Sequence, residues 1–142
     1  MDAVIYILSK YYGLKEIMGA EYSPTILNWI KKYFPETKDD EDVPYCSIGL
    51  IEIFKELGLE NKIVGTNPSA ISWINIGDSV GLSDAILGDI VVLKRVGGNH
   101  VGLFIRKNLK RDVIYVLGFN QSNSCSIVEF PINSLLDIRR LT

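Results

Sequence analysis

The chain has 142 residues, of which 47% are hydrophobic and 23% are charged. This length and composition are typical of one globular domain with its own core, so we expect residues 1–142 to form a single domain. The net charge of -2 disfavours a nucleic acid as the main partner, because phosphate binding requires an excess of Lys and Arg.

The N-terminal segment has neither the basic start nor the small-residue cleavage site of a secretory signal peptide. No apolar run reaches the ~20 residues that a membrane-spanning helix needs, so we expect no stable membrane insertion. Two cysteines and one histidine suggest neither a disulfide framework nor a Cys/His zinc site, and we expect no metal and no cofactor. The expectation is a reduced protein made in the cytoplasm.

The first half of the chain has helical periodicity. Apolar residues at three- and four-residue steps predict helices over 2–11, 24–34 and 46–57, and a short helix follows over 68–74. The acidic segment 36–42 is predicted to be a solvated loop. A role for its last residue, Asp42, beside a catalytic group is the alternative.

From Gly88 onward the periodicity changes to that of strands. Branched and alternating residues predict strands over 89–94, 100–105, 113–117, 124–130 and 137–141. Helices followed by a strand meander predict an α+β fold, in which N-terminal helices pack on a C-terminal antiparallel sheet.

Cys46 stands at the start of the third predicted helix, shortly after Pro44. The unpaired N–H groups and the positive dipole end of a first helical turn favour the thiolate, which is the nucleophilic form of cysteine. The alternative is a buried thiol that packs as a small hydrophobic residue. Cys125 lies inside a predicted strand, so we interpret it as a packing or surface residue. Ser47 is a weaker candidate nucleophile, because serine gains less from the dipole.

His100 is the one histidine of the chain, so any cysteine–histidine pair must include it. It follows a predicted turn and has the position of a base that removes a thiol proton. In a hairpin centred near Leu109 or Lys110, paired residue numbers sum to roughly 219–220, which places Phe119 or Asn120 opposite His100.

An asparagine carbonyl at that position accepts from one imidazole N–H and leaves the other nitrogen facing the thiol, as in a catalytic triad. Asn120 is therefore the predicted orienting residue. Gln121 is the alternative if a bulge shifts the register. In a third interpretation, segment 118–123 is only a polar turn.

Six short segments follow one another in an order that resembles a known family. They are GLKEIMG (13–19), PYCS (44–47), AISWINIG (70–77), GDIVVL (88–93), HVGLF (100–104) and GFNQSN (118–123). Together they resemble small papain-like peptidoglycan hydrolases of the NlpC and CHAP (cysteine, histidine-dependent amidohydrolase/peptidase) type, particularly a compact group common in phage and prophage lysis or tail genes. The resemblance spans nearly the whole chain, and the Gly-Asp strand followed by His-Val-Gly is its most telling part.

The resemblance implies a papain-like fold in which Cys46 is the nucleophile, His100 the base and Asn120 the orienting residue. It further implies a cysteine amidase or endopeptidase that cleaves peptide amides of bacterial cell wall through a thioester intermediate, as in an endolysin or a delivered effector.

Substrate contacts are expected at Tyr45, Trp73 and Gln121, with core packing as the alternative for Trp73. The chain departs from the usual family pattern at Tyr45, where tryptophan is usual, at Ser47, where alanine is usual, and at Phe119, where a second glycine is usual. These departures leave the chemistry intact and affect the fit of the substrate.

The partners implied by the resemblance are peptidoglycan stem peptides, together with a cognate inhibitor or immunity protein in the case of a delivered effector. The protein is then expected to act on the cell wall or in the periplasm after release or delivery by another system. A catalytically inactive module that binds wall peptide or a partner protein is the alternative from a different class.

Overall fold

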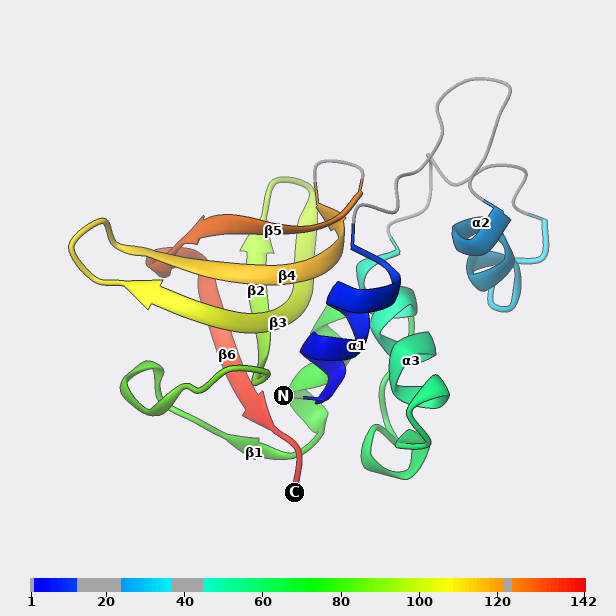
Figure 1. Cartoon of the computed structure of the whole chain (residues 1–142), viewed down its shortest axis with the longest axis horizontal. Coiled ribbons are helices and arrows are strands. Elements are labelled where there is room, and N and C mark those ends of the chain that lie inside the picture. Colours follow the sequence, from blue (N-terminus) through cyan, green and yellow to red (C-terminus); the bar gives the residue numbers. More distant parts are fainter. Residues whose placement is uncertain (1, 13–23, 37–44, 122–123) are drawn as a thin grey trace.

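The computed structural model describes residues 2–12, 24–36, 45–121 and 124–142, and it is an α+β protein with helices first and an antiparallel sheet afterwards (Figure 1). The helices are α1 (Asp2–Lys10), α2 (Pro24–Lys31) and α3 (Cys46–Glu56), with short 3₁₀ helices η1 (Glu60–Lys62), η2 (Ala70–Asn75), η3 (Leu82–Asp84) and η4 (Ile132–Ser134). The predicted α+β class and the helices of the first half are confirmed. The predicted short helix over 68–74 is the 3₁₀ helix η2.

The sheet has the strand order β1-β6-β2-β3-β4-β5, and neighbouring strands are antiparallel. Its strands are β1 (Asp78–Ser79), β2 (Ile90–Arg95), β3 (Gly98–Asn108), β4 (Val113–Gln121), β5 (Ser124–Pro131) and β6 (Leu135–Arg140). Strands β2 to β5 form the predicted meander. Strand β6, the last predicted strand, does not continue the meander beyond β5. It lies between β2 and the edge strand β1. No helix of the described ranges is long and apolar enough to cross a membrane.

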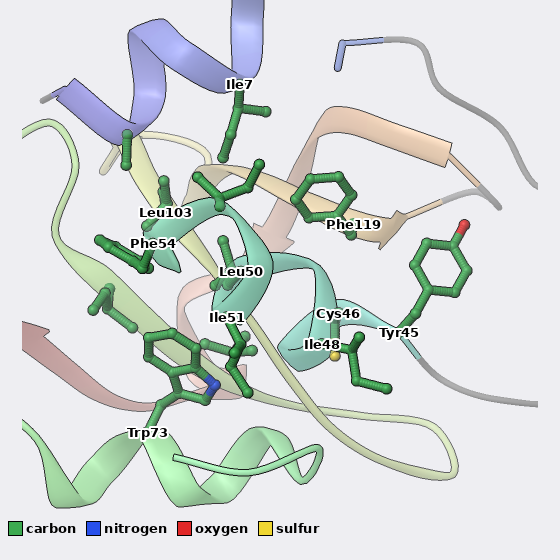
Figure 2. Packing of buried hydrophobic residues seen from close by; sticks show 14 of the residues in the cluster. Ile7, Tyr45, Cys46, Ile48, Leu50, Ile51, Phe54, Trp73, Leu103 and Phe119 are labelled. Carbon is green, nitrogen blue, oxygen red and sulfur yellow. The ribbon is translucent and has the colours of Figure 1, made fainter. Parts of the chain in front are cut away.

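Helix α3 forms the centre of the core. All residues from Cys46 to Phe54 are buried, because the sheet lies on one side of α3 and α1 and α2 lie on others. Figure 2 shows Leu50, Ile51 and Phe54 pointing from α3 into a cluster that includes Trp73. The single apolar face predicted from periodicity is therefore only part of the buried surface of this helix.

A close contact between α3 and β4 fixes the position of the helix start. Gly49 has no side chain, and a Cβ at this position would collide with the ring of Phe119. The Phe119 ring is fully buried and packs edge-on against Trp29 of α2 and Tyr11, with centroid distances of 5.4 Å and 6.2 Å. This packing brings the first turn of α3 against the ends of the central strands.

Candidate active site

Cys46 lines an open cleft of about 370 Å³. One wall of the cleft is formed by residues 68–70, at the start of η2, and the other by residues 95–99, where β2 turns into β3. Helix α3 begins at Cys46, and its first hydrogen bond runs from the Gly49 N–H to the Tyr45 carbonyl at 2.8 Å. The predicted placement of this cysteine in a first helical turn is confirmed.

The thiol of Cys46 is nevertheless protonated at neutral pH. Burial raises the pKa of this thiol above its ordinary value, because the thiolate would lose its hydration. The backbone N–H of Val101, the charge of Arg95 and the N–H groups of Ser47 and Cys46 lower the pKa, but by less than burial raises it. The N–H groups of the helix start therefore favour the thiolate, as predicted, but burial outweighs their effect on the pKa in the free protein.

His100 is fully buried at the start of β3, and its ring stacks on Phe130 with centroids 5.4 Å apart. Its Nε2 lies 2.8 Å from Oε1 of Gln121. The amide nitrogen of Gln121 donates to the carbonyls of Val116 at 3.0 Å and Ser126 at 2.7 Å. Because these two carbonyls require the nitrogen on their side, Oε1 must accept, and Nε2 of His100 must carry the hydrogen.

The tautomer of His100 leaves a free acceptor in the site. A neutral imidazole with hydrogen on Nε2 has its lone pair on Nδ1, which is buried and has no hydrogen-bond partner in the described part of the chain. Burial lowers the pKa of His100 to about 4, the bond to Gln121 opposes this change, and the charge of Arg95 adds to it. At neutral pH the site thus contains a neutral thiol and a neutral base.

Cys46 is the first residue of α3, and His100 lies near the start of β3. The backbone N–H that reaches the thiol belongs to Val101, the residue after His100, and the charge of Arg95 acts on both groups. Between described side chains, no hydrogen bond joins the thiol of Cys46 to the imidazole. Nδ1 of His100 is therefore left without a hydrogen-bond donor among the described side chains.

The predicted partner of His100 is corrected by a bulge in β4. Leu103 pairs with Leu117, as the predicted register requires, but the pairing of β4 with β5 shifts between Gly118 and Gln121. Within the shift, Asn120 adopts a left-handed φ of 59°. Gln121, the alternative, is consequently the residue that bonds to His100, and the expected pairing of Asn120 with the imidazole is wrong.

Two residues of this site had no clear signal in the sequence. A Cβ at Gly118 would lie 2.8 Å from Oε1 of Gln121 and 3.4 Å from Nε2 of His100, so glycine leaves the space that this pair occupies. Arg95 lines the cleft, and its Nη1 donates to the Asn120 carbonyl at 3.0 Å. A glycine inside a strand and a basic residue before a turn are too common to indicate a site by themselves.

The residues expected to contact substrate are buried instead. Tyr45 and Trp73 are fully buried (Figure 2), and Gln121 is 2% exposed, so this structure does not present their side chains at the surface, and substrate contact through them stays a prediction. Nε1 of Trp73 donates to Oγ of Ser47 at 2.7 Å, and this Oγ donates to the Asn67 carbonyl at 2.5 Å. Trp73 is thus part of the hydrophobic core, which is the alternative interpretation of this residue. The Ser47 hydroxyl is occupied by two hydrogen bonds.

Cys125, the other cysteine, is not among the described residues that line the cleft. Cys125 is buried in the same core cluster as α3, and burial raises the pKa of its thiol to about 12, which confirms the packing interpretation. Asp42 and the segment 13–19 lie outside the described residues. In the described ranges, no three side chains of the His, Cys, Asp or Glu type gather as a metal site would require.

No family model matches the chain, and no curated protein matches it. The function of the cleft must therefore be inferred from its own geometry and from the six segments described above.

Proposed function

We propose that this protein is a cysteine amidase or endopeptidase with a papain-like (NlpC/CHAP) fold, and that it cleaves peptide amide bonds of bacterial peptidoglycan. The observation that carries the proposal is the fixed tautomer of His100. The carboxamide of Gln121 holds the Nε2–H and leaves Nδ1 as a buried acceptor, and Val101, the residue after His100, donates its N–H to the thiol of Cys46 at the start of α3. The substrate class comes from the resemblance of the six segments. The site chemistry supports attack on an amide by a cysteine but does not identify the bond that is cleaved.

In the proposed reaction, His100 acts as a general base rather than as half of a preformed ion pair. Nδ1 accepts the thiol proton while Sγ of Cys46 attacks the amide carbonyl carbon. N–H groups at the start of α3 donate to the oxygen that gains negative charge. The imidazolium then protonates the leaving amine, and a thioester remains. Nδ1 then removes a proton from water, the hydroxide attacks the thioester carbonyl carbon, the C–S bond breaks, and Sγ takes the proton back from the imidazolium as the carboxylic acid leaves. Oε1 of Gln121 accepts from Nε2 throughout.

The proposal is tested by comparing the fragments that the protein releases from purified peptidoglycan. Mass spectrometry of soluble muropeptides should show the same products for the wild type and for Cys125→Ala, the matched control for loss of a buried thiol. Cys46→Ala should release none. Equal products and equal loss of turbidity with Cys46→Ala would refute catalysis at this site.

A second candidate is a catalytically inactive module that binds wall peptide or a partner protein. It is favoured by the absence, between described side chains, of a hydrogen bond from Cys46 to His100, together with the raised pKa of the thiol. This candidate predicts that the wild type sediments with insoluble peptidoglycan and releases no fragments.

We further infer that the site of action is the cell wall, reached after release or delivery by another system. Directing the wild type to the periplasm should lyse the cells, and expression in the cytoplasm should not. A cognate inhibitor or immunity protein is a partner if the chain is a delivered effector, and its co-expression should then prevent lysis. Lysis by the Cys46→Ala variant would contradict an enzymatic cause.

A further inference from the structure

Arg95 is the one charged residue among the described residues that line the cleft of Cys46. The other lining residues of segments 68–70 and 96–99 are small, apolar or neutral polar residues. Within the described part of the chain, the cleft therefore has a fixed positive charge and no negative charge to balance it.

Arg95 differs in this respect from the other arginines of the chain. Three of them form ion pairs with carboxylates and the fourth lies over a tyrosine ring: Arg111, Arg139, Arg140 and Arg106. No carboxylate of the described residues is within ion-pair distance of Arg95. An arginine that faces a cleft without an acidic partner is suited to bind an anion from outside.

The guanidinium of Arg95 is anchored but not saturated. Nη1 donates to the carbonyl of Asn120 at 3.0 Å, and Nε and Nη2 have no partner among the described residues. The anchor limits the motion of the guanidinium, so less conformational entropy is lost when a ligand binds. The same charge lowers the pKa of the Cys46 thiol and of His100, which agrees with a position close to both reacting groups.

We propose that Arg95 forms a carboxylate subsite beside Cys46, and that the preferred substrate carries a free carboxylate close to the amide that is cleaved. The identity of the cleaved bond rests on the proposed function, whereas binding of the carboxylate does not. Planar carboxylates match the parallel N–H donors of a guanidinium, whereas the corresponding carboxamide is neutral and presents one donor toward them. Stem peptides of bacterial walls contain such carboxylates, and some walls carry them as carboxamides.

The first test uses iodoacetate and iodoacetamide, two alkylating probes of similar size that differ in charge, on the full chain with Cys125→Ser. Both react by displacement of iodide by Sγ of Cys46, so the ratio of their rate constants cancels the thiolate fraction. We expect the iodoacetate to iodoacetamide ratio to be about tenfold higher for Cys46 than for glutathione, the effect of one charge-assisted contact.

Variants of arginine locate the preference. Arg95→Gln should reduce the ratio to that of glutathione, and Arg95→Lys should retain part of it because the charge remains. The matched control Arg111→Gln removes an arginine that is paired with Glu129 at the surface and should leave the ratio unchanged.

The wild-type protein provides a test that does not depend on the folding of any variant. Its preference for iodoacetate should decrease as NaCl increases, because salt screens the charge of an accessible arginine. A ratio equal to that of glutathione at low salt would overturn the proposal. Failure of both probes to reach Cys46 would do the same, since the proposal requires an open cleft.

The second test compares muropeptides that differ only in a carboxylate or a carboxamide beside the cleaved bond. We expect kcat/KM to be about tenfold higher for the carboxylate form, and Arg95→Gln to remove the difference mainly through KM.

Preferential alkylation without cleavage of either peptide would support the subsite and contradict the proposed hydrolase. Cleavage of both peptides with no charge preference in either test would overturn the subsite alone. An equal loss on both peptides in Arg95→Gln, with selectivity unchanged, would show that Arg95 only supports the Asn120 bulge.

Discussion

The side chain of Gln121 decides which nitrogen of His100 carries the proton. The amide nitrogen of Gln121 donates to two backbone carbonyls, which fixes the orientation of the carboxamide. Its Oε1 therefore faces His100 and can only accept, so Nε2 of His100 must be the donor. A side chain without an acceptor would leave Nε2–H unpaired in a buried site and allow the other tautomer. In the proposed reaction, Gln121 therefore positions the base and acts through His100.

We expect Gln121→Met to lower kcat by roughly 10²–10⁴-fold, because a positioned base contributes that much to proton transfer. ¹⁵N NMR of the single imidazole should show hydrogen on Nε2 in the wild type and a mixture of tautomers in the variant. The matched control is Asn120→Gly, which keeps the left-handed backbone and removes only the side chain. Loss of activity in Asn120→Gly with full activity in Gln121→Met would reverse the assignment.

Burial of His100 predicts an unusual response to acid. Burial lowers the pKa of this group from 6.5 to about 4, so between these values the unfolded chain binds the proton more strongly than the folded one. The free energy of unfolding is unaffected above pH 6.5, decreases as the pH falls, and loses roughly 3 kcal/mol once the pH is near 4.

Urea denaturation between pH 4 and 7 checks this prediction, with His100→Gln as the control that lacks the titrating group. The acid limb of kcat/KM should also lie near pH 4, because this limb reports the base of the free enzyme. An NMR titration midpoint of the imidazole at its ordinary value would contradict both expectations.

The positions of Cys46 and His100 in their elements could be predicted from the sequence, but the surroundings of these two residues could not. Cys46 could be placed because a helix start is encoded by local periodicity, and His100 because the chain has one histidine. Gln121 could not be preferred over Asn120, since the deciding feature is one left-handed residue in a bulge, which does not alter the apolar pattern. The burial of Tyr45 and Trp73 depends on packing between distant segments, which periodicity does not describe.

At the scale of elements, one hydroxyl connects α3 to the wall of the cleft. Oγ of Ser47 donates to the Asn67 carbonyl and accepts from Nε1 of Trp73, which belongs to η2. Asn67 precedes the cleft-lining residues 68–70, so these two bonds hold that wall against the helix that positions Cys46. Ser47 stands where the family that the chain resembles usually has alanine, and these two hydrogen bonds give the serine a structural role.

We expect Ser47→Ala to reduce the free energy of unfolding by about 1–3 kcal/mol, because it leaves the buried indole N–H of Trp73 unpaired and removes the shorter of two bonds to the Asn67 carbonyl. Chemical denaturation measures the change. The double variant with Trp73→Phe should cost less than the sum of the single variants, since each removes the same bond. Ser79→Ala, which removes an exposed bond to Asp137, is the control and should have little effect. Additive costs would show that the Ser47–Trp73 bond contributes nothing.

The strands show how far element prediction extends. Alternation correctly predicted β2 to β5 and their order, because short connections make neighbours in sequence neighbours in the sheet. The same pattern predicted a strand at the position of β6 but not its partners, since pairing with β1 and β2 is a long-range choice. The two-residue strand β1 is too short for any periodicity to indicate.

At the scale of the whole molecule, one buried carboxylate links the C-terminal strand β6 to the segment that precedes β2. Asp89 is 3% exposed and forms two bonds of 2.8 Å with Arg140 of β6, one to Nε and one to Nη2. Its Oδ2 also accepts the N–H of Ile86 at 2.8 Å. Residues of α1 and of the C-terminal strand line one pocket with this pair, so the ends lie side by side (Figure 1).

This arrangement gives Asp89, part of the most telling segment of the family resemblance, a structural role distant from the cleft. Both oxygens of Asp89 accept, so an asparagine must direct its amide nitrogen toward at least one donor in either orientation. We expect Asp89→Asn to reduce the free energy of unfolding by about 2–3 kcal/mol through loss of charge-assisted bonds. Hydrogen exchange should increase first in β6 and β1, which this pair holds against β2.

Glu129→Gln removes an ion pair with Arg111 of similar geometry at the surface and should leave stability nearly unchanged, because solvent already screens that pair. If both variants lost the same stability by urea denaturation, burial of the carboxylate would not be the cause. If Asp89→Asn also changed the ratio of muropeptide products, the role of Asp89 would extend to the cleft.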